Sequence, residues 1–431
     1  MLEILHQVVL NLRANKLRSF LTMFGILWGV ISVVILQATG EGFSRGNTKV
    51  LMELGKNIAI VWGARTGMQA GGERAGRQIF LTTDDVAALQ TESPMIEVVS
   101  AELQRGAVSV KSAYNAAAIL VDGIEPQYQN VRTIEVDRGR LINDVDEREA
   151  RRVAVVGFDA TTQLFSSRQS IGETIQLNGI PYTVIGRIRK KDQDSAYNGR
   201  DNDHVFVPFS AMARDLPRTD APAGVVSQII VAPKASVADA LPAILNARTG
   251  RIEDIDWPLA REVRRVVAKR HGFDPEDRDA LRVWDTSLES IMFARMIQAM
   301  KDFFSVVGLV TLSLGGLGVM NIMLVAVRER TREIGMRKAL GATSADIQRQ
   351  FFLEGFVLTL LSGVAGFAVA LGLCALVNLA PMPARFDGMI LTWQSAAAAV
   401  CALVLVGVVT STYPARRAAH LPPVEALRFE A

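Results

Sequence analysis

The sequence has few of the residues from which enzyme active sites and metal centres are usually built. It contains 431 residues, with only two cysteines, Cys374 and Cys401, and four histidines. No His-Glu-x-x-His run of the kind that binds zinc in proteases occurs. Residues 201–204 (Asp-Asn-Asp-His) lack the glycine and distal glutamate of a calcium loop, so they are predicted to form a polar loop. We predict no metal site, no catalytic residue and no enzyme activity.

The chain also lacks a nucleotide-binding loop. Such a loop ends in Gly-Lys-Ser or Gly-Lys-Thr, because its backbone amides and its lysine hold the phosphates. The single Gly-Lys step, Gly55-Lys56, is followed by asparagine and has Val50 where the first glycine belongs. We therefore predict that this chain has no nucleotide site or other cofactor of its own.

Long uncharged hydrophobic segments are abundant, and hydrophobic residues make up 49% of the chain. A transmembrane helix needs about 20 apolar residues, and residues 19–40, 303–327, 355–380 and 389–413 meet this requirement. Because a backbone within lipid must satisfy its own hydrogen bonds, each segment is predicted to be a helix in the bilayer. Residues 1–18 are predicted to form a cytoplasmic amphipathic helix at the membrane surface, and not a removable signal peptide.

Lysine and arginine indicate the orientation of the chain. Residues 1–18, 328–354 and 414–431 together hold 12 basic and 7 acidic residues, whereas residues 41–302 hold 34 and 36. Basic residues accumulate in cytoplasmic segments. Both termini and the 328–354 segment are therefore predicted in the cytoplasm, with residues 41–302 outside it. The net charge of +3 sums both sides of the membrane, so it does not indicate nucleic-acid binding.

Residues 41–302 have the pattern of a mixed α+β domain. Strand-like runs at 57–62, 107–110, 118–121, 153–156, 174–177, 182–185, 204–207 and 228–231 are bounded by turn residues. The Asn178-Gly179 step predicts a hairpin, and residues 233–249 and 258–270 are predicted to be helices. Residues 42–57 and 288–302 continue the neighbouring spans as helical stalks. The predicted fold is a membrane protein with four transmembrane helices and a large α+β extracytoplasmic domain between the first two.

A short charged segment follows the second predicted span. Residues 328–342 interleave arginine and glutamate with small residues, and Thr343 with Asp346 resembles a capping box that begins the next helix. A stop-transfer loop would explain the basic residues but neither the glutamates nor the small residues. Such a segment suits close approach by another surface.

These residues carry a resemblance that extends over nearly the whole chain. The run 329–342 after Met320-Asn321-Ile322-Met323 resembles the hallmark of the MacB/FtsX-type ABC transporter permeases. Residues 15–22 resemble that family's entry into the first span, and residues 414–427 its C-terminal tail. Arg138-Gly139-Arg140 and residues 152–157 resemble the MacB-type periplasmic domain. Unlike MacB itself, this chain has no ATPase fused before its first span.

The resemblance implies a permease subunit of an efflux or mechanotransmission complex in the bacterial inner membrane. It implies a separate ABC ATPase that binds ATP-Mg, a permease homodimer, and a membrane-fusion-type periplasmic adaptor with an outer-membrane channel. The segment that contacts the ATPase would consist of Glu329, Arg330, Arg332, Glu333, Ile334, Gly335, Arg337, Lys338, Ala339, Gly341 and Ala342.

Small residues in the spans are predicted to allow close helix packing, either within one chain or between two. They are Gly25, Gly29, Gly308, Gly315 and Gly318, with Asn321 nearby.

Two alternatives within this family remain open at this point. One is an FtsX-like protein that signals to a periplasmic enzyme without transport, and the other is a LolC/LolE-like permease that releases lipoproteins. An export or drug-susceptibility assay beside a pull-down of cell-wall hydrolases would decide between efflux and the FtsX-like alternative.

Overall fold

The computed structural model describes residues 16–55, 57–191, 197–218, 221–240, 257–383, 385–423 and 426. Within these residues, four helices are long and apolar enough to cross a membrane, as the sequence predicted. The predicted amphipathic helix at residues 1–18 lies almost entirely outside the described residues. The four helices are α2 (Lys16–Leu54), α10 (Thr286–Glu329), α12 (Ser344–Val377) and α13 (Trp393–Ala419).

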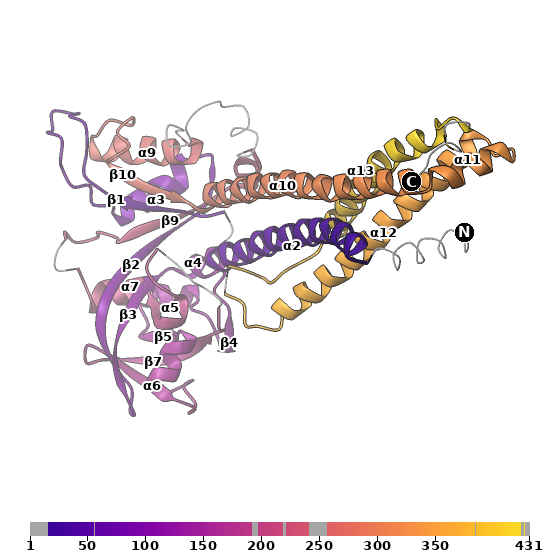
Figure 1. Ribbon diagram of the computed structural model, residues 1–431. Helices are drawn as coiled ribbons and strands as arrows, with labels where there is room; N and C mark the ends of the chain where they lie inside the picture. The colour runs from indigo at the N-terminus through magenta and orange to yellow at the C-terminus, as the bar shows by residue number, and fades with distance from the viewer. Residues whose placement is uncertain are drawn as a thin grey trace. The chain divides into compact units, whose positions relative to one another are not determined.

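The chain divides into two compact units. One contains Met1–Gly46 and Ala294–Ala431, and the other contains Asn47–Phe293. Helices α2 and α10 each continue beyond their predicted spans without a break, so both helices contribute residues to the two units. Figure 1 shows α2 and α10 as two long helices. In the sequence, all the strands of the sheet lie between these two helices.

The second unit is built on one mixed sheet. Its strands follow the order β10-β1-β9-β2-β3-β8-β5-β7-β4, and β6 pairs with both β2 and β7. The pairs β3–β8 and β5–β7 are parallel, and the other pairs are antiparallel. The strands are β1 (Ala59–Gly63), β2 (Ile96–Lys111), β3 (Ala116–Ile124), β4 (Val136–Gly139), β5 (Val153–Val156), β6 (Thr174–Leu177), β7 (Ile180–Ile188), β8 (His204–Pro208), β9 (Gln228–Pro233) and β10 (Leu281–Asp285).

Helices cover this sheet and complete its hydrophobic cores. One core joins β1, β9 and β10 to α3 and α9, and another joins β5, β7 and β8 to α6 and α7. A third core contains Ile60, Tyr128, Phe206 and Ile230, with Trp62 and Trp284 packed against it. The helices are α3 (Thr83–Glu92), α4 (Pro126–Val131), α5 (Asp144–Arg148), α6 (Phe158–Phe165), η1 (Asp201–Asp203), α7 (Phe209–Asp215) and α9 (Pro258–His271).

The predicted Asn-Gly hairpin is confirmed. Asn178 and Gly179 both have positive φ, 48° and 88°, which is the conformation that a two-residue hairpin turn of this type requires. Other elements differ from prediction. Strand β2 extends over Ile96–Lys111 where only residues 107–110 were expected, and β10 was not predicted at all. The helix expected at 233–249 is present at residues 235–240, and its remainder lies outside the described residues.

The residues just before the first strand and just after the last strand of the sheet are hydrogen-bonded to each other. The Ile58 amide donates to Thr286 Oγ1 at 3.1 Å, and the Thr286 amide donates to the Ile58 carbonyl at 2.9 Å. Strands β1 and β10, which follow and precede these residues, pair antiparallel over their full lengths. The chain thus enters and leaves this unit through adjacent strands.

Candidate functional site

The segment after α10 forms a separate short helix. Helix α10 ends at Glu329, and α11 (Thr331–Ala339) begins after Arg330, whose backbone leaves the helical conformation. Gly341 then turns the chain with φ of 103°. Thr343 accepts a hydrogen bond from the Asp346 amide, and Asp346 accepts one from the Thr343 amide, so the predicted capping box is confirmed.

One side of α11 is fixed to the neighbouring helices. Ile334 and Gly335 are buried. Arg337 donates to Gln350 of α12 and pairs with Glu333, both at 2.7 Å. Lys338 donates to the carbonyls of Ala419 and Leu421, at 2.5 and 3.0 Å, where α13 ends. A cation there is favourable, because the last carbonyls of a helix lack amide partners within the helix.

Arg330 adds a further contact between this segment and α12. Its guanidinium lies 3.4 Å from a carboxylate oxygen of Glu354, which is itself largely buried. Ala342 is half-buried against the helices of the unit. These contacts hold the whole segment in one conformation relative to α12 and α13.

The opposite side of α11 presents an exposed stripe, which we define as Arg332, Met336, Ala339 and Leu340. These residues recur at helical spacing, and all are exposed. Met336 is 48% exposed and Leu340 is 90% exposed. Glu329 and Gly341 are exposed at the two ends of the segment. Large apolar side chains that project between charged residues are typical of a surface that another protein covers.

The structure therefore divides the eleven residues predicted to contact an ATPase. Four of them are exposed: Glu329, Arg332, Ala339 and Gly341. Two are buried, Ile334 and Gly335, and two have hydrogen-bond partners within this chain, Arg337 and Lys338. The predicted set omitted Met336 and Leu340. Met336 and Leu340 follow Arg332 by four and eight residues, and this helical spacing is the sequence signal that could have identified them.

Four of the predicted packing glycines lie between α2 and α10 of the same chain. A Cβ on Gly25 would lie 3.1 Å from the Gly315 Cα, and one on Gly29 would lie 2.9 Å from the Leu312 Cα. A Cβ on Gly308 would collide with the Val33 side chain. Gly318 is partly exposed and Asn321 exposed, so neither is enclosed by this chain alone.

A run at residues 42–46 (Gly-Phe-Ser-Arg-Gly) has the Gly-x-Ser-x-Gly spacing of hydrolase nucleophiles. It lies inside α2, whereas a nucleophile elbow is a sharp turn between a strand and a helix. The run therefore gives no support for a hydrolase.

The second unit contains a buried network of charged side chains that the sequence did not reveal. Asp201 pairs with Arg132 at 2.8 Å and with Lys191 at 2.7 Å, and all three are buried. The charges of Arg132 and Lys191 more than offset the effect of burial on Asp201, so its pKa is lowered. Asp201, Asn202 and His204 are thus buried, and only Asp203 is partly exposed, which corrects the prediction of a polar loop.

The network continues along β3 and β8. His204 Nδ1 lies 2.8 Å from a carboxylate oxygen of Asp122. Burial lowers the pKa of His204, but the hydrogen bond to Asp122 and its negative charge raise it by more, so the pKa of His204 is raised. Tyr197 donates to Glu102 and contacts the hydroxyl of Tyr128 at 2.8 Å. Burial, and then the charge of Asp122, raise the pKa of Glu102 to about 8.

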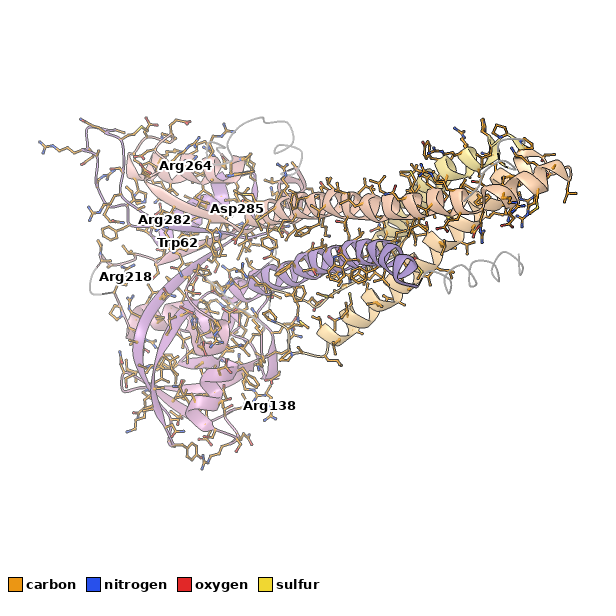
Figure 2. The ribbon with its side chains drawn as sticks, viewed as in Figure 1. Trp62, Arg138, Arg218, Arg264, Arg282 and Asp285 are labelled. Atoms are coloured by element: carbon orange, nitrogen blue, oxygen red, sulfur yellow. The ribbon has the colours of Figure 1, made fainter. Side chains whose placement is uncertain are left out.

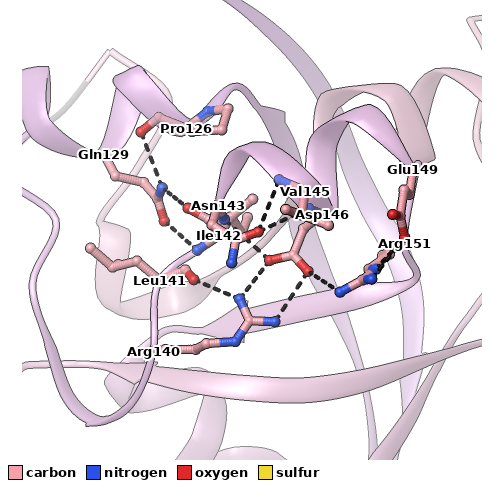
Figure 3. A network of polar contacts seen from close by, with 10 residues as sticks. All are labelled: Pro126, Gln129, Arg140, Leu141, Ile142, Asn143, Val145, Asp146, Glu149 and Arg151. Carbon is pink, nitrogen blue, oxygen red and sulfur yellow. Dashed lines mark hydrogen bonds and ion pairs between the residues drawn. The ribbon is translucent and has the colours of Figure 1, made fainter.

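The Arg138-Gly139-Arg140 motif has a structural role. Figure 3 shows Arg140 paired with Asp146, at 2.5 and 3.1 Å, in the first turn of α5, and Arg151 on the same carboxylate. Gly139 has φ of 82°, and any Cβ there would collide with the backbone of β7. The motif therefore fixes α5 against β4 and β7.

Two family models match the chain. A model described as "MacB-like periplasmic core domain" matches residues 19–247, and one described as "FtsX-like permease C-terminal" matches residues 305–423. The first covers most of the second unit and the second covers most of the helical unit.

Curated relatives align along the full chain. The "Uncharacterized ABC transporter permease YknZ" of Bacillus subtilis is 29% identical over 100% of both chains. The "Macrolide export ATP-binding/permease protein MacB" of Bdellovibrio bacteriovorus is 30% identical over 100% of this chain and 62% of that protein. The MacB of Vibrio parahaemolyticus is 31% identical over 99% of this chain and 60% of that protein. This chain thus spans less than two thirds of the length of these MacB relatives.

Two solved structures are similar to part of the chain. The periplasmic region of MacB from Actinobacillus actinomycetemcomitans has 16% identity and a TM-score of 0.40, over 57% of this chain and 95% of that chain. The extracellular domain of YknZ, from Gram-positive bacteria, has 17% identity and a TM-score of 0.40, over 53% of this chain and 100% of that chain.

Proposed function

Because the chain belongs to the family of MacB/FtsX-type ABC transporter permeases, we propose that it is the membrane subunit through which a separate ATPase drives export. In this proposal the ATPase binds ATP-Mg and docks on α11. Its movement passes through the helices to the extracytoplasmic domain, which acts on the substrate. The proposal includes the localisation predicted from the sequence, an inner-membrane protein with both termini in the cytoplasm.

The exposed stripe of α11 is the observation that carries this proposal. Leu340 is 90% exposed, and Met336 projects beside it between charged residues. An apolar pair of this kind is favourable in water only when a partner covers it. The stripe belongs to a segment that the sequence places in the cytoplasm, where an ATPase would be.

The contacts of α11 support mechanical coupling. Arg337 ties it to α12 and Lys338 ties it to the end of α13, so displacement of α11 would act on both helices. Helix α10, which ends at the same segment, is continuous back to Thr286 at the end of β10. Mechanical coupling of this kind requires neither an ion pair nor a cofactor site within the membrane-spanning segments.

The proposed partners follow from the family. They are a second copy of the permease, a membrane-fusion-type adaptor and an outer-membrane channel, beside the ATPase and the lipid bilayer. Asn321 is exposed on the single chain and is available for a contact with the second copy.

Substitution of Leu340 by serine tests the docking surface. Burial of a leucine contributes about 2 kcal/mol, so Leu340→Ser should weaken ATPase binding about 30-fold. The tagged full-length chain would be purified from native membranes, the co-purifying ATPase identified by mass spectrometry, and its affinity measured by titration. Export of macrolides and other drugs would be compared in the same strains.

Leu379→Ser is the matched control, because Leu379 is 83% exposed but lies after α12 and outside the stripe. It should retain the ATPase. Reversal of Glu333 is a poorer test, since Glu333 pairs with Arg337 within the chain. The proposal is wrong if no ABC ATPase binds the native chain, or if Leu340→Ser binds it as tightly as the control does.

A further inference from the structure

The segment between the second and third predicted spans, residues 328–354, is closed by a contact between its two ends. Arg330 lies near its start, and Glu354 is its last residue. Arg330 Nη1 lies 3.4 Å from Glu354 Oε1, although the two residues are 24 positions apart in the sequence. We call this ion pair the base clamp, because it joins the beginning of α11 to α12.

Glu354 lies on the buried face of α12. It follows Ile347 by seven residues and Phe351 by three, and both of these belong to the hydrophobic core of the helical unit. Glu354 is only 5% exposed. A carboxylate is costly to bury without a cation nearby. An apolar residue would therefore pack more favourably at this position, unless the charge itself has a use.

Three helices approach one another beside Glu354. A Cβ on the next residue, Gly355, would lie 2.8 Å from Ser411 Oγ on α13 and 3.6 Å from Met323 Cγ on α10. This part of α12 is thus packed closely against both α10 and α13. A contact that fixes Glu354 acts where the helices have little room to slide.

Arg330 is the junction between α10 and α11. Its amide donates to the Ala326 carbonyl of α10 at 3.1 Å, and its carbonyl accepts the Ile334 amide of α11 at 3.0 Å. Its ψ of 13° leaves the helical conformation. One residue therefore carries hydrogen bonds of both helices. A contact that holds its side chain also fixes the direction in which α11 leaves α10.

A second polar contact lies closer to the turn between α11 and α12. Arg337 donates to Gln350 at 2.7 Å. It follows Arg330 along α11, whereas Gln350 precedes Glu354 along α12, so the two contacts join antiparallel helices at successive levels. The capping box that begins α12 closes the turn itself. Helix α11 is thus attached to α12 at the turn, at its middle and at its base.

We infer that Glu354 and Arg330 are positioning residues that make α11 and residues 344–354 move as one body. This rests on the proposed function, because it specifies how docking of the ATPase on α11 would reach α12. Without the base clamp, α11 could pivot about the turn at Gly341 and leave α12 in place. Arg330, predicted to contact the ATPase, would instead act within the chain.

Hydrogen exchange of the full chain in nanodiscs tests the base clamp. Glu354→Gln keeps the shape of the side chain and removes its charge, so the amides of α11 should exchange about tenfold faster than in the parent. Arg330→Gln should have the same effect, and the two together should be no worse than either alone, since they remove one shared contact. Arg349→Gln, exposed on α12, and Arg138→Gln, exposed on β4 (Figure 2), are controls that should exchange as the parent does.

The response to ATP tests whether the base clamp positions α11 for coupling. The chain would be purified with the ATPase that binds it, and hydrogen exchange of residues 344–354 compared with and without ATP and vanadate. ATP should change this exchange in the parent complex and not in Glu354→Gln. Both chains should bind the ATPase with the same affinity, because the base clamp lies outside the exposed stripe of α11.

An apolar pair separates positioning from stability. Apolar residues can replace a buried ion pair without loss of stability, so Arg330→Met combined with Glu354→Leu should melt at the temperature of the parent. This variant should still lose the response of residues 344–354 to ATP, because an apolar contact does not fix the direction of the Arg330 side chain. If the ion pair only stabilised the fold, then the apolar pair would respond to ATP as the parent does.

The outcomes separate failure of this inference from failure of the proposed function. If no ABC ATPase binds the parent, then the proposed function is wrong, and hydrogen exchange of α11 still decides whether the base clamp holds it. The inference is overturned if Glu354→Gln leaves that exchange at the parent value. It is also overturned if residues 344–354 do not respond to ATP in the parent complex, or if they respond equally in Glu354→Gln or in the apolar pair.

Discussion

Replacement of Glu102 by glutamine tests whether the buried network of the second unit holds a proton at neutral pH. Glu102 is completely buried on β2, where it accepts hydrogen bonds from Tyr197 and Asn198. Burial and the nearby charge of Asp122 raise its pKa from 4.5 to about 8. Glutamine has the shape of the neutral acid and can keep a donor and an acceptor in the same positions.

The size of the effect follows from proton linkage. Because the pKa is higher in the folded state than in the unfolded state, the folded chain keeps a proton that the unfolded chain loses between pH 4.5 and about 8. The free energy of unfolding therefore falls as pH rises through that window, by about 1.4 kcal/mol per pH unit. From pH 6.0 to 7.5 the Glu102 contribution is about 2 kcal/mol, which corresponds to about 4–8 °C in Tm for a unit of this size.

The assay is thermal unfolding of the full chain at these two pH values, followed by tryptophan fluorescence. Substitution of Trp28 and Trp393 by phenylalanine leaves only the tryptophans of the second unit as reporters. Glu102→Gln should melt at a higher temperature than the parent at pH 7.5 and should lose most of the parent's pH dependence. Glu97→Gln, an exposed glutamate on the same strand, should behave as the parent. Equal pH dependence in the parent and in Glu102→Gln would refute the reasoning.

Two further substitutions address packing and buried charge. Gly315→Ala should destabilise the helical unit by about 1–3 kcal/mol, because the added Cβ would lie 2.6 Å from a backbone carbon of α2. Gly372→Ala is the control and should be neutral, because its Cβ would point into open space. Equal shifts in the melting temperatures of the two variants in detergent would contradict this prediction. Asp201→Asn removes the carboxylate that neutralises Arg132 and Lys191, and should cost about 3–5 kcal/mol. Faster limited proteolysis of the second unit would show the loss, and protease resistance equal to the parent's would count against it.

The features that were predictable from the sequence are those that local residues determine. The four spans follow from uncharged runs, the turn at Asn178-Gly179 follows from the positive φ that both residues tolerate, and the cap at Thr343 follows from its spacing to Asp346. In each case the determining residues lie within a few positions of one another. No knowledge of the tertiary fold was required.

The features that the sequence did not reveal depend on pairing between distant segments. Arg132 and Asp201 are 69 positions apart, the first just after α4 and the second just before β8, and only the tertiary fold makes them neighbours. Strand β10 has an irregular alternation, Leu-Arg-Val-Trp-Asp, and is stabilised by pairing with β1. Lys191 ends a run of polar residues after β7 that nothing in the sequence links to the core, yet Asp201 holds it there.

The candidate docking site was predictable only in part. The charged segment after α10 could be located from its composition, but its inner and outer faces could not be assigned. Lys338 faces inward because α13 ends beside it, and Leu340 is exposed because the chain turns at Gly341. These assignments depend on how α11 packs against α12 and α13.

The hydrogen bonds between Ile58 and Thr286 make the extracytoplasmic domain an exchangeable module. Its two ends lie side by side, so the domain can be excised with a short bridge between α2 and α10, or replaced by another domain whose ends are equally close. Chimeras built at this junction would keep the four long helices and α11 and change only the domain between α2 and α10. Insertion at a single pair of adjacent strands is also a route by which relatives could vary this domain while α11 stays the same.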